Sequence, residues 1–409
     1  MVKENVMKQT EIGLLPEDWS LEILSTVSLL KGRIGWQGLN QSEFTDNDNQ
    51  PFLITGMNFK DGKIRWNEVY HVSDERYEIA KDIQLKNDDV LMTKDGTIGK
   101  MLYVDNIPYP FKASLNSHLL LFRPKNNKYI PKYLYYNLQF KYFLNHIEEN
   151  KSGTTFFGLS QSSVGKYKIP LPPLPEQEAI AEALSDADAW IESLEQLIVK
   201  KRFIKQGAMQ ELLSPKEDWE VKKLGEVATI SGGGTPSTFV SEYWNGDIEW
   251  FTPTEVGYDK YLYSSKRKIT NTGLKNSSAT ILPVNTILLT SRAGIGDLGI
   301  LKIEASTNQG FQSIICKEAV DVEFIYYLMS TKKEDLLKNA SGSTFLEISP
   351  NKVKSLEIII PSLAEQTRIA TILSDMDAEL EALEGQLGKA RKVKQGMMQE
   401  LLTGRVRLV

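Results

Sequence analysis

One segment of the chain occurs twice, and this repeat limits the possible folds more than any other feature. Residues 172–213 and 361–402 align without a gap at an offset of 189, and 24 of the 42 aligned pairs are identical. Both copies contain P-x-L-x-E-Q, then S-D-x-D, then K-Q-G-x-M-Q-E-L-L. The long segments before the two copies differ almost completely. The chain therefore presents two different surfaces on one repeated frame.

The apolar residues of each copy recur at alternating steps of four and three, the heptad pattern of helices that pair along a seam. The predicted seam consists of Ile180, Leu184, Ile191, Leu194 and Ile198 in the first copy, and of Ile369, Leu373, Met376, Leu380, Leu383 and Leu387 in the second. Each copy begins acidic and ends basic, so only an antiparallel arrangement places acids opposite bases. We predict an antiparallel two-helix coiled coil. The alternative is that each helix packs only on its own neighbouring domain.

The segments outside the helices contain short strand-like runs between Gly and Asn turns, with a few short helical patterns. Weak matches also relate these two segments: Thr55 to Thr252, Thr93 to Thr290, and Asn116 to Asn308. We therefore predict an α+β protein with an internal pseudo-two-fold repeat. Its two globular mixed α/β domains are each followed by a long helix. The predicted ranges are 1–170 and 216–360 for the domains, and 171–215 and 361–409 for the helices.

Composition narrows the classes of function. The apolar runs are too short to span a bilayer, and the first residues lack the apolar stretch of a signal peptide. The single cysteine, Cys316, fits a reducing cytoplasm, and the three scattered histidines do not suggest a metal site. The net charge is −5, and residues 1–170 and 216–360 carry net charges of only +1 and −2. Affinity for DNA would therefore have to come from local clusters or from a partner.

The sequence contains none of the common catalytic signatures. It lacks the phosphate-binding loop of nucleotide triphosphatases, the nucleophile elbow of hydrolases and the N/D-P-P-Y/F motif of amino-methyltransferases. Asp88 and Asp89 could form half of a nuclease metal site, but no matching E-x-K motif follows a strand. We therefore expect no catalytic residues and no metal on this chain.

Two loops that follow predicted strands are candidate DNA contacts. The first contains Lys94, Asp95, Gly96 and Thr97, and the second contains Arg292, Ala293 and Gly294. A basic side chain beside glycine can reach a groove while the backbone approaches a phosphate. The alternative is an ordinary β-turn with a solvated charge.

A second group of candidates is individually weaker. Gly233, Gly234 and Thr235 form either a phosphate-binding loop or a plain turn. Polar and aromatic residues near the loops could contact bases or phosphates: Trp36, Gln37, Asn58, Asn116, Thr252, Thr254, Glu255 and Asn308. Tryptophans such as Trp66, Trp244 and Trp250 more often serve packing than recognition. Phe156, Phe157 and Phe345 follow matching turns before each helix, where a structural joint is the simpler interpretation.

The order of variable domain, repeated helix, variable domain and repeated helix resembles the specificity subunits of type I restriction–modification systems. The resemblance covers nearly the whole chain. Residues 231–255, with SGGGTPS, YW and GDIEWFTPTE, are similar to a common opening of that family's target recognition domains. Residues 288–296, LLTSRAGIG, look like its second internal motif. The first variable domain departs from this opening, with KGRIG and PFLITGMNF, so we expect it to recognise another sequence.

The resemblance implies a non-catalytic DNA-binding subunit. Each recognition domain would grip one half of a split double-stranded DNA target, and the antiparallel helices would set the distance between the halves. Two methyltransferase subunits would dock on the helices and carry S-adenosylmethionine. Restriction subunits would use ATP and Mg²⁺ if they are present. The alternative is a coiled-coil scaffold that joins two heads for ligands other than DNA.

Overall fold

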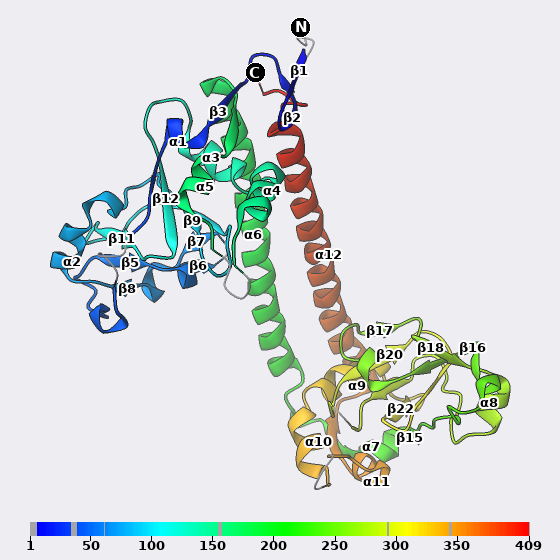
Figure 1. Cartoon of the computed structure of the whole chain (residues 1–409). Helices are drawn as coiled ribbons and strands as arrows, with labels where there is room; N and C mark the ends of the chain where they lie inside the picture. The colour runs from blue at the N-terminus through cyan, green and yellow to red at the C-terminus, as the bar shows by residue number, and fades with distance from the viewer. Residues whose placement is uncertain are drawn as a thin grey trace. The chain divides into compact units, whose positions relative to one another are not determined.

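The chain forms two compact units in the computed structural model, which describes residues 6–33, 39–60, 62–153, 158–292, 294–342 and 346–408 (Figure 1). Unit 1 comprises residues 1–195 and 386–409, and unit 2 comprises residues 196–385. Each unit contains one globular domain and a part of each long helix. The boundaries of the compact units therefore differ from the predicted boundaries between domains and helices, because each long helix contributes residues to both units.

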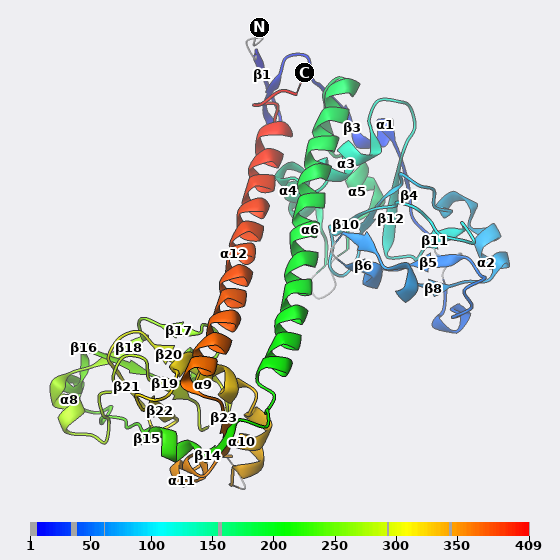
Figure 2. The same cartoon turned by 180° about the vertical axis from the view of Figure 1, so that it is seen from behind.

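The two repeats form helices of equal length. Helix α6 spans Leu174–Leu212 and helix α12 spans Leu363–Leu401, each with 39 residues, and Figure 2 shows both. Pro175 lies in the first turn of α6, where the missing N–H is tolerated. The predicted α+β fold, with a long helix after each mixed α/β domain, is confirmed.

Ion pairs within each unit establish the direction in which the helices pair. In unit 2, Arg202 of α6 lies 2.6 Å from Glu384 of α12. In unit 1, Arg391 of α12 lies 2.6 Å from Glu195 of α6. These are the same pair in the two repeats, because both residues shift by 189. Acidic and basic segments meet as the charge order predicts, so the antiparallel arrangement is confirmed.

The predicted seam is buried most fully where the globular domains pack on it. Buried seam residues are Ile180, Leu184, Leu194, Ile198, Ile369 and Leu373. Partly exposed seam residues are Ile191, Met376, Leu380, Leu383 and Leu387. Ile180 and Leu184 belong to the core of unit 1, and Ile369 and Leu373 belong to the core of unit 2. Leu194 and Ile198 are buried within the coil, outside these cores.

Two sheets form each domain. In unit 1, a four-stranded sheet has the order β10-β9-β12-β4 and a three-stranded sheet has the order β11-β5-β8. Their bounds are Met101–Tyr103 (β10), Val90–Thr93 (β9), Leu119–Pro124 (β12), Ser28–Lys31 (β4), Ala113–Leu115 (β11), Phe52–Ile54 (β5) and Tyr70–His71 (β8). Strands β11 and β5 are parallel, whereas all pairs in the larger sheet are antiparallel.

Unit 2 repeats this design with one more strand in its larger sheet. Its five-stranded sheet has the order β15-β22-β19-β20-β17, and its three-stranded sheet has the order β18-β16-β21. Their bounds are Ala228–Gly232 (β15), Gln312–Cys316 (β22), Ile287–Leu289 (β19), Leu298–Leu301 (β20), Tyr261–Leu262 (β17), Arg267–Ile269 (β18), Trp244–Phe251 (β16) and Ala305–Thr307 (β21). Strands β16 and β21 are parallel, like β5 and β11 in unit 1.

The larger sheet of each domain is buried on both faces, which explains its continuous apolar runs. In β9, Val90 and Met92 belong to the core cluster that contains Ile180 and Leu184 of α6. The intervening Leu91 points to the other face, into the cluster with the three-stranded sheet. The larger sheet therefore lies between the helical layer and the smaller sheet.

Short helices and ribbons complete the domains. The helices are α1 (Leu24–Val27), α2 (Asp74–Ile79), α3 (Pro131–Asn137), α4 (Lys141–Asn150), α5 (Gln161–Gly165), α7 (Leu224–Val227), α8 (Asn271–Lys275), α9 (Val322–Ser330), α10 (Lys333–Asn339) and α11 (Pro350–Lys354). The ribbons pair β1 (Met7–Thr10) with β2 (Gly13–Pro16), β3 (Ser20–Ile23) with β13 (Lys168–Leu171), β6 (Phe59–Lys60) with β7 (Lys63–Ile64), and β14 (Glu220–Lys223) with β23 (Glu357–Ile360).

The glutamine of the repeated E-Q motif holds a domain helix against each coil helix. Gln177 Oε1 accepts a hydrogen bond from the Ile130 N–H at 2.9 Å, at the start of α3. Gln366 Oε1 accepts the equivalent bond from the Asp321 N–H at 3.0 Å, at the start of α9. The motif recurs because it performs the same task in both units.

In unit 1, residues near the C-terminus of the chain contact residues near its N-terminus and at the start of α6. Arg407 forms ion pairs with Glu176, 2.5 Å away, and with Asp18, 2.8 Å away. The Glu176 side chain is completely buried and also accepts a hydrogen bond from Trp19 Nε1 at 3.1 Å. Leu401 and Leu402 lie in the same apolar core. Residues that follow α12 therefore complete the first domain.

Replacing Arg407 by alanine is expected to destabilise unit 1 by about 3 kcal/mol, because it leaves the buried Glu176 carboxylate without its counter-charge. Chemical denaturation of the full chain measures the change. Arg368→Ala is the matched control, because Arg368 pairs on the surface with Glu365, the counterpart of Glu176. Equal losses for the two variants would contradict a buried pair that depends on Arg407.

None of the helices in the described ranges combines the length and apolar content needed to cross a membrane. Across the same ranges, His, Cys, Asp and Glu side chains do not gather in threes as a metal site requires.

Candidate nucleic-acid interface

Three loops meet at one edge of the domain in unit 1. They follow β5, β9 and β11 and comprise residues 55–58, 94–99 and 116–118. The Asn116 N–H donates to Ile54 O at 2.9 Å, and the Lys94 N–H donates to His118 O at 2.9 Å. We call these residues the three-loop cluster of unit 1.

Unit 2 contains the same cluster. Its loops follow β16, β19 and β21 and comprise residues 252–255, 290–292 with 294–296, and 308–310. The Asn308 N–H donates to Phe251 O at 3.1 Å, and the Ser291 N–H donates to Gly310 O at 2.8 Å. These bonds correspond one by one to those of unit 1. The two domains therefore share a frame of loops while their side chains differ.

A threonine at the base of the middle loop fixes its shape in both units. Thr93 Oγ1 donates to Thr97 O at 2.5 Å and accepts from the Lys100 N–H at 3.0 Å. Thr290 Oγ1 donates to Gly294 O at 2.6 Å and accepts from the Asp297 N–H at 2.9 Å. The matches of Thr93 with Thr290 and of Asn116 with Asn308 are thus confirmed by equivalent bonds.

The basic residues of the two middle loops do not occupy equivalent positions. Lys94 and Ser291 make the same backbone hydrogen bond, so Lys94 corresponds to Ser291. Asp95 then corresponds to Arg292. Ser291 is buried, whereas Lys94 is partly exposed. A single-residue shift alternates the direction of side chains on extended backbone, so the two domains present their basic groups differently.

The charged groups of the two clusters have different partners. Arg292 pairs with Glu347 at 2.8 Å, and both side chains are partly exposed. Asp95 lies 3.3 Å from Nδ1 of His118. Lys94 makes no ion pair within the described part of the chain. Of the predicted basic contacts, Lys94 is therefore the group that is available to an anion without first breaking a pair.

The predicted asparagines divide into two kinds. Oδ1 of Asn116 and of Asn308 accepts the N–H two residues later, from His118 and Gly310 respectively. Over the described ranges, their amide NH₂ groups have no partner. These groups can donate to a base or a phosphate.

Asn58 has a different role. It is buried, and its side chain bonds to Thr55 and to the Glu68 backbone. Its counterpart Glu255 bonds to Thr252 in the same way. We therefore expect Asn58 and Glu255 to shape the first loop of each cluster, and not to contact DNA themselves. Thr254 is exposed beside Thr252.

The glycine-rich segment after β15 packs closely within its domain, which favours the plain turn over the phosphate-binding loop. The Gly234 N–H donates to Thr307 O at 2.9 Å, so it is not available to a phosphate. A Cβ on Gly233 would lie 2.0 Å from Asn308 O. Thr235 Oγ1 donates to Gln309 Oε1 at 2.5 Å. The glycines therefore hold this segment against the third loop of the cluster.

Three tryptophans that the sequence analysis considers, Trp66, Trp244 and Trp250, behave as packing residues. Trp244 and Trp250 are buried edge to face, 5.0 Å apart, with the guanidinium of Arg267 3.7 Å above the Trp244 ring. Trp66 packs on Phe52 at 5.0 Å. The candidate contacts Trp36, Gln37 and Ala293 lie outside the described residues, as do Phe156, Phe157 and Phe345.

Two features of the cluster were not predicted. The Met57 side chain is 75% exposed in the first loop of unit 1. Arg33 is buried, donates from Nε to Leu115 O at 2.9 Å, and so supports the strand that leads to Asn116. Burial, together with the nearby Arg76, lowers the pKa of Arg33 to about 10. Arg33 and Met57 lie in the KGRIG and PFLITGMNF segments, but the sequence alone does not show that one is buried and the other exposed.

Comparisons with known proteins agree on one family. Residues 36–200 and 216–389 each match the family model described as the type I restriction modification DNA specificity domain. The family model therefore matches the chain twice, once in each repeat, and the two matched ranges together include most of the chain.

Curated relatives fall in the same group. The chain is 47% identical over 169 residues to the MjaIX specificity subunit of Methanocaldococcus jannaschii, an alignment that covers 40% of this chain and only 39% of that relative. It is 29% identical over 438 residues to the putative MjaX specificity subunit of the same organism, covering 99% and 98% of the two chains. It is 30% identical over 286 residues to the EcoR124I/EcoR124II specificity subunit of Escherichia coli, covering 66% and 69%.

Solved structures show the same fold. The S subunit of a type I restriction–modification system from M. genitalium aligns with a TM-score of 0.60 at 17% identity, covering 94% of this chain and 96% of that one. A chain from a study of type I complex assembly aligns with a TM-score of 0.58 at 16% identity, covering 96% and 99%.

Proposed function

Because the chain belongs to the type I restriction–modification DNA specificity family, we propose that it recognises a two-part DNA target and positions methyltransferase subunits on it. The observation that carries this proposal is the repeated three-loop cluster. Each unit holds the same loop frame, but Lys94 and Asp95 in one occupy the places of Ser291 and Arg292 in the other. Two equal frames with different side chains suit two different half-sites.

Loops at the edge of a sheet are suited to reading DNA. Their backbones are fixed by internal hydrogen bonds, so side chains such as Lys94 and the Asn116 amide are held in place before binding. Lysine and asparagine supply donors for phosphates and for bases respectively. Because the chain has a net charge of −5, it has few excess cations to neutralise DNA phosphates. We therefore expect partner subunits to supply much of the contact with the DNA phosphates.

The helices offer equivalent places for two copies of one partner. Leu174 and Leu363 occupy equivalent positions and are 42% and 46% exposed, and Ile204 and Val393 are 46% and 52% exposed. Exposed apolar side chains at matching positions suit two identical methyltransferase subunits. Those subunits would carry S-adenosylmethionine. Restriction subunits, where they join, would bring ATP and Mg²⁺, and this chain would have no catalytic role.

Mapping adenine methylation across a genome tests this function. The chain is co-expressed with its methyltransferase, and methylated positions are read by single-molecule sequencing. We expect one split motif that disappears when the gene for this chain is deleted. A motif that persists without the chain, or no motif at all, would favour the alternative of a scaffold for ligands other than DNA.

Lys94→Ala is expected to weaken DNA binding by the assembled complex about tenfold, and to reduce the dependence of log affinity on log salt by about one unit if Lys94 contacts a phosphate. Titrations at several salt concentrations measure both quantities. Lys81→Ala, at an exposed lysine of the 3₁₀ helix Lys81–Ile83, is the matched control. A Lys94 variant that binds like this control would exclude Lys94 from the interface.

A further inference from the structure

In both units, a buried tyrosine of the globular domain is hydrogen-bonded to the S-D-x-D motif of a coil helix. In unit 1, Tyr136 of α3 donates to Asp188 Oδ2 at 2.8 Å and lies 3.2 Å from Ser185 Oγ. In unit 2, Tyr327 of α9 donates to Asp377 Oδ2 at 2.6 Å and lies 3.3 Å from Ser374 Oγ. These sets are equivalent members of the repeat.

The same aspartate binds a lysine from the other coil helix. Lys394 Nζ lies 2.5 Å from Asp188 Oδ1, and Lys205 Nζ pairs with Asp377 Oδ1. Each lysine also lies over the ring of its tyrosine, 5.5 Å from that of Tyr136 and 5.6 Å from that of Tyr327. Both lysines belong to the repeated K-Q-G motif. The two motifs therefore recur because each meets the other across the antiparallel helices.

We call these two sets, Tyr136–Ser185–Asp188–Lys394 and Tyr327–Ser374–Asp377–Lys205, the coil clamps. Each clamp joins three segments at one carboxylate: a domain helix, a coil helix and the opposing coil helix. Burial raises the pKa of both tyrosines far above the usual range, so their hydroxyls stay protonated as donors.

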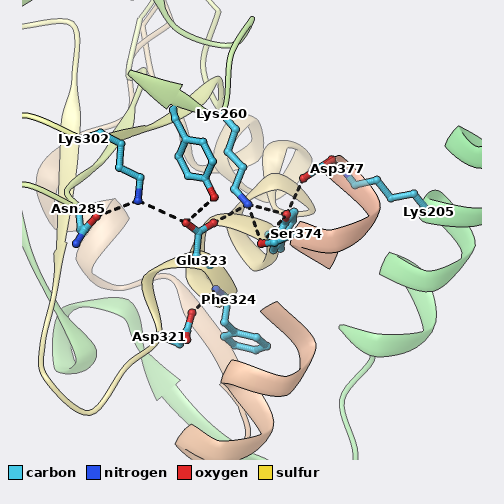
Figure 3. A network of polar contacts seen from close by, with 11 residues as sticks. Lys205, Lys260, Asn285, Lys302, Asp321, Glu323, Phe324, Ser374 and Asp377 are labelled. Carbon is cyan, nitrogen blue, oxygen red and sulfur yellow. Dashed lines mark hydrogen bonds and ion pairs between the residues drawn. The ribbon is translucent and has the colours of Figure 1, made fainter. Parts of the chain in front are cut away.

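The clamp of unit 2 is extended by a second lysine (Figure 3). Lys260 Nζ donates to Tyr327 OH at 2.7 Å and to Ser374 Oγ at 3.0 Å, and it pairs with Glu323 at 2.6 Å. Its ammonium lies 4.4 Å from the centre of the Tyr327 ring. This lysine is largely buried, and loss of any one partner would leave a charge poorly solvated.

Over its described residues, unit 1 shows no such extension. Lys63, which the offset of 197 aligns with Lys260, is well exposed and pairs with Glu192 of α6 at 2.5 Å. Lys132 occupies the position that corresponds to Glu323, and its ammonium lies 5.4 Å from the Tyr103 ring. Among the described residues, the clamp of unit 2 therefore holds its domain with more partners than the clamp of unit 1 does.

We propose that the coil clamps are positioning sites, which fix the orientation of each recognition domain on the coil and the register of the two helices together. A shift of one residue in the register of a coil helix moves it by about 1.5 Å along its axis and turns it by about 100°. Such a shift would separate the aspartate from both its tyrosine and its lysine. Apolar packing alone tolerates small slips better than a carboxylate with two directional partners. The part of this inference that concerns DNA spacing rests on the proposed function.

Distance measurement in the full chain tests the clamp without DNA. Spin labels are attached to Lys275→Cys on α8 and Glu381→Cys on α12, both in unit 2, with Cys316→Ser removing the native thiol. We expect a single narrow distance distribution in the parent. Tyr327→Phe combined with Asp377→Asn should at least double its width. The variant keeps both side-chain volumes, and circular dichroism checks that it is folded.

Tyr326→Phe is the matched control, because it removes the neighbouring hydroxyl, which has no hydrogen-bond partner over the described residues. This control should leave the distribution unchanged. Equal widths in the folded double variant and the control would overturn the clamp as a positioning site. Lys205→Arg should retain the narrow distribution, whereas Lys205→Ala should broaden it.

A second arm tests the consequence for DNA. The assembled methyltransferase is given substrates whose two half-sites are separated by the normal gap, or by one base pair more or less. The double variant should lose at least tenfold of its preference for the normal gap while recognising the same half-sites. An unchanged preference with broadened distances would overturn the DNA part alone. If the parent methylates no split target, the proposed function fails, and the distance arm still decides on the clamp.

Discussion

Exchanging residues 15–170 for the corresponding segment of another specificity subunit is expected to change one half of the methylated target and leave the other half intact. The three-loop cluster of unit 1 lies wholly within this segment, and that of unit 2 lies wholly outside it. Each mismatched base pair costs about 1–3 kcal/mol, so methylation of a half-site with several changed pairs should fall more than about a thousandfold. Single-molecule sequencing of methylated DNA reads both halves at once.

The exchanged domain must keep the hydrogen bonds that attach the native domain to helix α6. Trp19 bonds to Glu176, and Tyr136 bonds to Asp188, so both residues are kept in the exchanged segment. Exchange of residues 220–360 with Tyr327 retained is the reciprocal control, and it should change the other half. A target altered in both halves by one exchange would show that the two domains do not read independently.

Inserting one heptad into both long helices is expected to widen the gap between the two half-sites by about three base pairs. Seven helical residues add about 10 Å, and base pairs rise by about 3.4 Å. The insertions are placed after Glu195 in α6 and after Gly385 in α12, which are the boundaries between the two compact units. A whole heptad keeps the apolar seam in phase. Methylation mapping gives the new gap directly.

Replacement of seven existing residues at the same places, without a change in length, is the control for this insertion. It should leave the gap as it was. A lengthened variant that methylates its original target with an unchanged gap would reject the idea that the helices set the spacing. Half-site sequences should stay the same in every variant, because the recognition loops are untouched.

The sequence predicts the repeated frame well. The heptad spacing and the order of charges are local and periodic, so they establish the helices and their antiparallel direction, as the pair Arg202–Glu384 and its counterpart confirm. The tryptophans Trp244 and Trp250 also pack as expected. Such features depend on spacing along one chain segment, which a sequence displays directly.

Contacts between distant segments are less accessible from sequence. The offset of 197 aligns Lys94 with Ser291, but only the folded chain shows that Lys94 is partly exposed while Ser291 is buried. The packing role of Gly234 depends on Thr307, 73 positions away. The coil clamps join motifs that the repeat made visible, but the tyrosine that links them lies in a diverged domain. Only the folded chain brings these groups together.

Unit 1 is assembled from two separated stretches of the chain, and this has a consequence for biosynthesis. Leu401 and Leu402 share a core with Leu15 and Ile180, although all of unit 2 is translated between them. The first domain to leave the ribosome is therefore the last to complete its core, whereas unit 2 can close as soon as its own continuous segment has emerged. A polypeptide terminated within unit 2 keeps an open apolar face, which marks it for chaperones and proteases before it can compete for partners.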